Sequence, residues 1–190
     1  CNAAFGTGAL SCNTTGGCNT ALGFRALCNL TTGNCNVAVG TDSGHQTSMV
    51  NFTTESNRGV FGHTDITNAY VKVAWTVTSD ARDKINFESV PHGLDFVNQL
   101  EPYKFNFKKS REDDTPHGSA RYGFKAQDIL ALEGDNPIII DNHNEDKFSV
   151  TNSHLIPVLV NAIQELSAKN DSLETSNQAL IARIEALENA

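Results

Sequence analysis

A serine and a lysine five residues apart are the side chains of this sequence that most directly indicate covalent chemistry. Ser79 and Lys84 lie in the segment SDARDK, residues 79–84. A serine hydroxyl is a weak nucleophile until a base removes its proton. A lysine is such a base only as the free amine, which requires a pKa well below the usual value of about 10.4. Burial or a neighbouring cation such as Arg82 would favour the free amine, whereas the two neighbouring aspartates would oppose it.

The same segment also has a purely structural interpretation. Asp80 follows a stretch of apolar and polar alternation, and an aspartate at such a place can cap a turn or a helix. The remaining charged residues would then form a solvated run. A serine and a lysine at this spacing therefore do not by themselves indicate an enzyme.

The residues that would position Ser79 alternate between apolar and polar side chains. The apolar members are every second residue from Val71 to Val77, with lysine, alanine and threonine between them. A period of two is typical of a half-buried strand. We therefore expect a strand over 71–77 that leads directly to Ser79.

Behind Ser79 the patterns predict a small α+β unit. Leu94, Val97 and Leu100 have helical spacing, and Pro102 ends that helix. The other expected elements are strands at 103–107 and 122–124, a helix at 126–132 that Gly134 stops, and strands at 138–140 and 148–150. The charged segment 108–120 is expected to be a loop.

The first 44 residues hold a repeat with a period of 17. The motif CNAAFG at residues 1–6 recurs as CNTALG at 18–23 and as CNVAVG at 35–40. Each unit is too short to bury a core alone and becomes stable only when stacked on the next. We expect short strands separated by turns in a narrow β-roll or solenoid, and a further strand at 59–62. The repeat resembles the stacked head repeats of trimeric bacterial adhesins and of phage fibres.

Five cysteines all lie within the first 35 residues, and one opens each repeat unit. We expect a ladder of small buried side chains, with disulfides between stacked units or between chains as the alternative. A metal site is not expected, because no CxxC spacing and no adjacent histidine accompanies them.

Composition excludes two other classes. The formal net charge is -8 and the 14 basic residues are scattered, which argues against a nucleic-acid-binding protein. No apolar run approaches the roughly 20 residues of a membrane-spanning helix. Because the first residues contain neither Met nor a charged leader, we expect a fragment that begins inside a longer polypeptide.

The last 35 residues predict a parallel coiled coil. Apolar residues and two asparagines repeat every seven positions over about four heptads. Pairs of opposite sign between g and e′ positions, Lys169 with Glu174 and Arg183 with Glu188, favour parallel chains in register. A single helix packed on its own domain is the alternative, but it would leave an apolar stripe in water. The heptads do not decide between dimer and trimer. The predicted a and d residues are Ile156, Leu159, Ile163, Leu166, Asn170, Leu173, Asn177, Leu180, Ile184 and Leu187.

Four motifs occur together in the order known from one protein family. They are SDARDK at 79–84, LEPYKF at 100–105, YGFKAQDI at 122–129, and a closing strand and helix from FSV at 148–150 to LIPVLVNAIQEL at 155–166. This set resembles the intramolecular chaperone domain of phage tailspikes and tail fibres, the endosialidase-type domain of the S74 peptidase family. The polar insert at 108–120 departs from the family pattern and affects only a loop.

The resemblance implies a domain that trimerises, drives the folding of a preceding β-rich shaft and then cuts itself off. Carried over, the scissile bond is Thr78–Ser79, Ser79 is the nucleophile and Lys84 is the general base, with Asp80 and Arg82 in support. Such a serine–lysine endopeptidase acts once, in cis or within the trimer, and needs no cofactor or metal.

The predicted architecture is a mixed fold that assembles as a homotrimer. It has a stacked β-repeat shaft at 1–44, a β-rich connection at 45–78, the α+β chaperone domain at 79–155 and the parallel coiled coil at 156–190. We expect the C-terminal part of a viral tail fibre or tailspike, located in the virion and, during assembly, in the host cytoplasm. Its expected partners are its own copies, the upstream fibre of the same chain and a host-surface receptor. The alternatives are a non-cleaving trimeric adhesin or fibre foot, and an enzyme that acts on an external substrate.

Overall fold

The computed structural model describes residues 1–189, which form two compact units. The first unit comprises residues 1–74 together with 106–120, and the second comprises residues 75–105 together with the chain from 121 onward. The first is built on strands and the second mainly on helices, so the chain has a mixed fold. Among the described residues, every helix is too short or too polar to cross a membrane.

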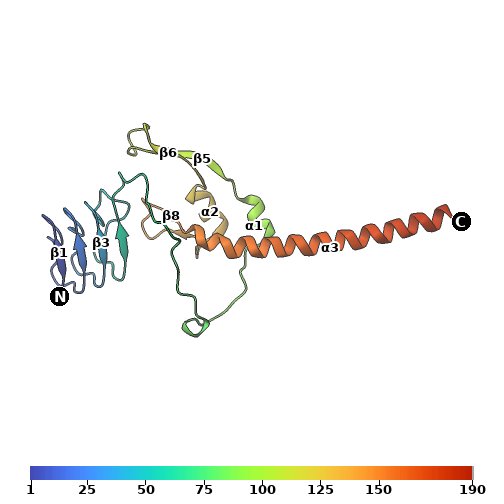
Figure 1. Cartoon of the computed structure of the whole chain (residues 1–190), viewed down its shortest axis with the longest axis horizontal. Helices are drawn as coiled ribbons and strands as arrows, with labels where there is room; N and C mark the ends of the chain where they lie inside the picture. The colour runs from blue at the N-terminus through green and yellow to red at the C-terminus, as the bar shows by residue number, and fades with distance from the viewer. Residues whose placement is uncertain (190) are drawn as a thin grey trace. The chain divides into compact units, whose positions relative to one another are not determined.

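Four short parallel strands stack in chain order in the first unit (Figure 1). They are β1 (Ala3–Phe5), β2 (Thr20–Leu22), β3 (Val37–Val39) and β4 (Gly59–Phe61). Ala4, Ala21, Ala38 and Val60 are aligned across the sheet, so the first two steps are 17 residues and the third is 22. The strands expected from the repeat, and the further strand at 59–62, are therefore present.

A ladder of asparagines holds these strands in register. The side-chain Oδ1 of Asn19 accepts from the backbone N–H of Asn36 at 2.9 Å and from its Nδ2 at 3.1 Å. Asn2 binds Asn19 in the same way one step earlier. Each Nδ2 also donates to a loop carbonyl, that of Gly33 in the case of Asn19. Because Asn19 and Asn36 are buried, these bonds replace the water that the amides would otherwise require.

The interior of the stack is filled by small strand residues and by larger residues from the turns. Ala21 and Ala38 point inward from the strands, while Leu27, Leu30 and Phe52 fill the space between strands and loops. At Gly6 and Gly23 the backbone of the next unit approaches so closely that an added Cβ would overlap a carbonyl group, and both residues have a positive φ. A side chain there would force neighbouring units apart.

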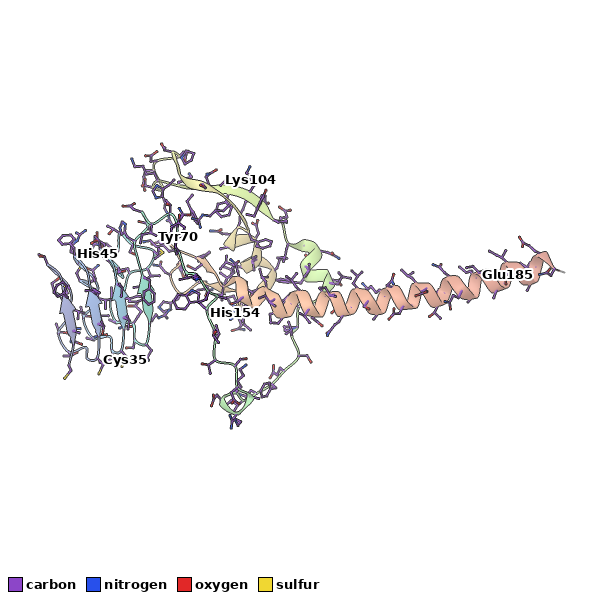
Figure 2. All side chains as sticks on the ribbon, in the orientation of Figure 1. Cys35, His45, Tyr70, Lys104, His154 and Glu185 are labelled. Carbon is purple, nitrogen blue, oxygen red and sulfur yellow. The ribbon has the colours of Figure 1, made fainter. Side chains whose placement is uncertain are left out.

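The prediction of buried cysteines is wrong for the three cysteines that open the repeats. Cys1, Cys18 and Cys35 are exposed, and Figure 2 labels Cys35 at an edge of the strand stack. Asn19 and Asn36 are buried, and the cysteines before them, Cys18 and Cys35, are directed outward with a positive φ. Cys28 is buried, and this burial raises the pKa of its thiol. All five cysteines are free thiols.

The second unit packs three helices around a small core. Its elements are α1 (Leu94–Gln99), α2 (Ala126–Glu133), β7 (Ile140–Asp141), β8 (Ser149–Val150), the 3₁₀ turn η2 (Asn152–His154) and the long helix α3 (Leu155–Glu188). Phe96, Ile129, Ile140, Leu155 and Val158 are buried together in this core. Both predicted helices and the antiparallel pair of closing strands are present.

A two-stranded sheet is formed by β5 (Tyr103–Lys108) and β6 (Pro116–Gly123). The strand expected at 103–107 is confirmed. The loop expected at 108–120 is wrong in its second half, because β6 begins at Pro116. The loop was predicted because the segment is polar and lacks apolar alternation. That alternation marks a half-buried strand, whereas β6 is largely exposed.

The predicted strand at 71–77 is absent from the single chain. This segment forms no strand. A strand requires a partner edge to accept its backbone hydrogen bonds. Within residues 1–189 the hydrogen bonds of the segment 70–89 remain inside the turn 79–84, so such an edge is missing from the chain itself.

Helix α3 has two different apolar faces. Leu155, Val158 and Ala162 are buried against the second unit's own core. The a and d residues predicted from the heptads lie on another face, and the apolar ones among them are 43–71% exposed. The first two turns of α3 thus pack on their own domain without using the a/d positions.

Candidate active site

A local turn positions the serine and the lysine. The 3₁₀ helix η1 (Ala81–Asp83) follows Asp80, whose side chain caps it by accepting from the backbone N–H of Arg82 at 2.9 Å. The backbone N–H of Lys84 then donates to the carbonyl of Ala81, which ends the turn. The capping role considered for Asp80 is therefore confirmed, and the turn reverses the chain between positions 79 and 84.

This reversal brings the two candidate catalytic side chains together. Lys84 Nζ donates a hydrogen bond to Ser79 Oγ across 2.6 Å. A protonated lysine donates in this geometry, and a free amine at the same distance would accept the serine proton instead. The separation lies within the range required for a base to remove a proton directly from a nucleophile.

The two supporting residues, Asp80 and Arg82, bind each other. Arg82 Nε lies 3.1 Å from both carboxylate oxygens of Asp80, and its Nη2 also donates to that carboxylate. These side-chain hydrogen bonds, together with the capping bond, lower the pKa of Asp80, and the same contact raises the pKa of Arg82. Within residues 1–189, Asp80 is engaged with Arg82, and Lys84 contacts Ser79 instead of a carboxylate.

The site is exposed in a single chain. Thr78, Ser79 and Lys84 are accessible to solvent, and so are the apolar side chains on either side of the turn. The exposed fraction is 59–82% for Val71, Val73, Trp75, Val77, Ile85 and Phe87. In Figure 1 the green segment that leads to α1 is correspondingly an extended loop with η1 at its tip. We refer to residues 70–93 as the dyad loop.

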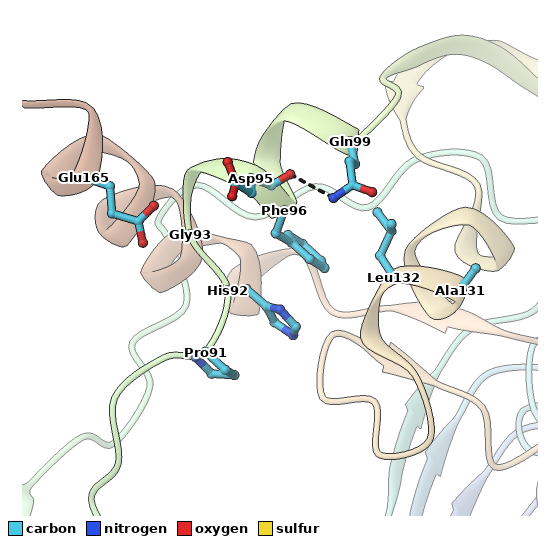
Figure 3. A pocket seen from close by; sticks show the side chains of 9 residues that line it. All are labelled: Pro91, His92, Gly93, Asp95, Phe96, Gln99, Ala131, Leu132 and Glu165. Atoms are coloured by element: carbon cyan, nitrogen blue, oxygen red, sulfur yellow. Dashed lines mark hydrogen bonds between the residues drawn. The ribbon is translucent and has the colours of Figure 1, made fainter. Parts of the chain in front are cut away.

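The C-terminal end of the dyad loop is fastened to α3. Asn161 Nδ2 donates to the carbonyl of His92 at 2.9 Å and approaches that of Val90 at 3.4 Å. Glu165 Oε2 accepts from the backbone N–H of Leu94 at 2.7 Å and thereby caps α1. Figure 3 shows Glu165 of α3 beside the backbone of the loop, at one side of a cavity of about 440 Å³.

The cavity is lined by residues of the second unit. Its walls come from the end of the dyad loop, from α1 and α2 and from Glu165, and the rings of His92 and Phe96 are stacked along it with centroids 4.2 Å apart. Within residues 1–189 there is also no group of three or more His, Cys, Asp or Glu side chains placed to hold a metal ion.

Sequence reasoning did not assign a role to Asn161 or Glu165. Both lie in the motif at 155–166, on the side of α3 away from the a/d positions and four residues apart. Two polar residues at that spacing share one helix face. This shared face was the feature of the sequence that could have indicated a joint role. The partners of the two residues lie about 70 residues earlier in the chain, so local sequence patterns do not identify them.

Comparison with known proteins identifies the segment that holds this site. Residues 79–135 match the model of the Peptidase_S74 family, described as chaperone of endosialidase. The match begins at Ser79 and includes the turn, α1, β5, β6 and α2. No curated protein and no solved structure matches the chain. Residues 79–135 are therefore an intramolecular chaperone domain of the Peptidase_S74 family, in agreement with the resemblance seen in the sequence.

Proposed function

We propose that the chain is part of a viral tail fibre or tailspike and that its domain from Ser79 onward trimerises, templates the folding of the stacked β-repeats and releases itself by cutting the Thr78–Ser79 bond. The observation that supports this most directly is the 2.6 Å contact between Ser79 Oγ and Lys84 Nζ. It lies at the first residue of the chaperone-family match, immediately after the bond that would be cut.

The chemistry needs only groups of the chain and one water molecule. Lys84, as the free amine, takes the proton of Ser79 Oγ, and Oγ attacks the carbonyl carbon of Thr78. The C–N bond breaks as the ester forms, and the leaving nitrogen takes a proton to become the new amino terminus. Water then hydrolyses the ester, which gives a carboxylate at Thr78 and restores the serine hydroxyl. Attack by Ser79 of a neighbouring copy would give the same products.

Exposure of the dyad in the single chain supports a link between cleavage and assembly. Burial disfavours the charged form of a lysine, so a lysine in water remains mostly an ammonium ion and a poor base. If copies of the chain cover the dyad loop, they remove water from the pair and favour the free amine. The precursor would then be stable as a monomer and reactive only after assembly.

The apolar side chains of the dyad loop support self-association. Full burial of a large apolar side chain contributes roughly 1.5–3 kcal/mol, so covering the six exposed ones would contribute on the order of 10 kcal/mol per chain. The exposed a/d residues of α3 provide a second such surface, suited to parallel copies. We therefore expect the segment 71–77 to form its strand with neighbouring copies, which would supply the missing edge.

A further apolar column supports the same assembly in the repeat unit. Phe5, Leu22, Val39 and Phe61 are aligned on the outer face of the four strands, and the two phenylalanines are largely exposed. We propose that copies pack along this column in the mature fibre, which would stand in the virion and meet a host-surface receptor.

Mass spectrometry of the purified chain tests the proposal. The wild type should separate into one fragment that ends at Thr78 and one that begins at Ser79, while native mass spectrometry should report three copies. Ser79→Ala should abolish the cut, and Lys84→Ala should slow it by about 10²-fold or more, the usual effect of removing a general base. Both variants should still form trimers.

An intact wild-type trimer under folding conditions would contradict self-cleavage. It would instead support the non-cleaving fibre foot, in which the segment 79–84 is only a capped turn. Turnover of an added substrate by the intact chain would indicate an enzyme that acts on external molecules.

A further inference from the structure

The dyad loop is anchored at its C-terminal end by one face of α3. Within residues 1–189, the hydrogen bonds of residues 70–89 stay inside the turn that carries Ser79 and Lys84. The next contact along the chain is that of Asn161 with the carbonyls of Val90 and His92. Val90 lies six positions after Lys84, so this anchor is within about 20 Å of the dyad even for an extended chain.

Glu165 completes the anchor by binding the residue that starts α1. Its Oε2 accepts from the N–H of Leu94, and its Oε1 lies 3.4 Å from Asn161 Nδ2. The two side chains thus hold backbone groups of Val90, His92 and Leu94 and also contact each other. Figure 3 shows the Glu165 carboxylate directed from α3 toward Gly93.

The glycine at position 93 makes room for this contact. A Cβ added to Gly93 would overlap the carboxylate of Glu165. A larger residue would therefore push the carboxylate away from the N–H of Leu94. The close approach of the loop backbone to Glu165 depends on a residue without a side chain.

Asn161 and Glu165 lie outside the a and d positions of α3, which would form the contact between helices in the predicted coiled coil. In the heptad assignment they are f and c, whereas Ile156, Ile163 and Leu166 are a and d residues and face away from the domain core. The anchor residues and the a and d residues belong to one continuous helix. Copies aligned in register along α3 would therefore hold their dyad loops at the same height along the common helix axis. The anchor thereby connects the alignment of the helices to the position of the reacting groups.

We propose that Asn161 and Glu165 are positioning residues for cleavage, which fix the root of the dyad loop on the helix that aligns the copies. This inference rests on the proposed self-cleavage. The two residues do not touch the reacting atoms, and they act by limiting the positions that Ser79 and Lys84 can occupy when the copies come together. A small misplacement of reacting groups is sufficient to slow a reaction by about 10²-fold.

Cleavage kinetics test this role. Full-length chains with Asn161→Ala or Glu165→Ala should cleave at the same bond but about 10- to 100-fold more slowly than the wild type, with three copies still present by native mass spectrometry. Glu185→Gln is the matched control, since it removes a carboxylate from an exposed b position of the same helix and should leave the rate unchanged. Wild-type rates for both anchor variants would overturn the proposal, and so would loss of the trimer.

Gly93 provides a steric test of the same contact. Gly93→Ala should slow cleavage because the added methyl group displaces the Glu165 carboxylate. In the double variant with Glu165→Ala the methyl group meets no carboxylate, so the two effects should not add. Additive effects would indicate that Gly93 matters for its own backbone conformation, and this result would contradict the contact as the cause.

Hydrogen exchange separates failure of this inference from failure of self-cleavage. In the Ser79→Ala precursor, Glu165→Ala should accelerate exchange of the Leu94 amide and its neighbours, while amides of α3 beyond residue 169 keep their protection. That result without any cleavage by the wild type would contradict the proposed function but leave the anchor intact. Unchanged exchange at Leu94 would contradict the anchor whatever the wild type does.

Discussion

At the scale of single residues, the charges around the dyad are arranged so that Lys84 is left to the serine. Asp80 is the carboxylate next to Ser79, and an unpaired carboxylate there would attract a lysine ammonium. It is instead occupied by the Arg82 guanidinium and by the backbone N–H that it caps. The lowered pKa of Asp80 reflects these bonds. The pair thus shapes the turn and removes a competing partner for Lys84.

Replacing Arg82 should slow cleavage. In Arg82→Gln the Asp80 carboxylate loses its guanidinium partner and becomes free to bind the Lys84 side chain, which would draw Nζ away from Ser79 Oγ. First-order cleavage rates of the variant and the wild type, measured under the same conditions, give the size of the effect. Arg111→Gln, in the exposed loop between β5 and β6, is the control, and a wild-type rate for Arg82→Gln would contradict the idea.

The dyad could be predicted from sequence because it is local. Six consecutive residues contain the cap, the turn and both candidate catalytic side chains, so the motif at 79–84 carries nearly all of its geometry. The anchor could not be predicted in this way, because Asn161 and Glu165 meet their partners only when α3 packs beside α1 within the second unit.

At the scale of elements, the patterns predicted what each segment does by itself or with its own repeat. The 17-residue period indicated the strands that become β1–β3, and helical spacing indicated α1 and α2. The segment 71–77 shows the limit of this reasoning. Its alternation indicates which side chains would be buried in a strand. A strand forms only where a partner edge exists, and the sequence pattern does not show whether that edge belongs to the same chain.

The asparagine ladder should be a major source of stability for the strand stack. Asn36→Ala removes a buried amide whose Nδ2 donates to the carbonyl of Glu55 at 2.8 Å and whose Oδ1 accepts from the N–H of Arg58 at 3.0 Å. Each buried partner left without a hydrogen bond costs about 1–3 kcal/mol, so the free energy of unfolding should fall by roughly 3 kcal/mol or more. Urea unfolding of the Ser79→Ala precursor measures this.

Asn68→Ala is the comparison for that experiment. Asn68 is exposed and its side chain donates to that of the neighbouring Thr67, so its replacement should leave the urea midpoint nearly unchanged. Equal effects of the two substitutions would show that the ladder contributes no more than an ordinary surface asparagine.

At the scale of the whole molecule, the proposed cut separates the repeats from the domain that would have aligned them. Parallel pairing between distant segments forms slowly, and many stacked units have nearly equivalent registers. A helical domain that joins the copies first would raise their effective concentration. If that domain is removed, the repeats would keep their structure only because unfolding is slow.

Refolding experiments should show whether the repeats can refold without the domain that begins at Ser79. After complete denaturation and dilution, the uncleavable Ser79→Ala precursor should regain its trimer and its β-sheet signal. The separated fragment 1–78 should not, because nothing then fixes the register of its copies. Circular dichroism and native mass spectrometry of both samples measure the recovery. Equal recovery of the isolated fragment would show that the repeats need no template.

The unequal spacing of the four strands has a consequence for how identical units are told apart. Steps of 17 residues look the same to a neighbouring copy, so two chains displaced by one step would still match strand for strand along β1–β3. The step of 22 residues before β4 breaks this translational symmetry. In a displaced copy, the 22-residue segment between β3 and β4 would lie beside a 17-residue segment of its neighbour, and the two chains would not match there. The five extra residues before β4 thus distinguish the correct alignment of the copies from one displaced by a single repeat.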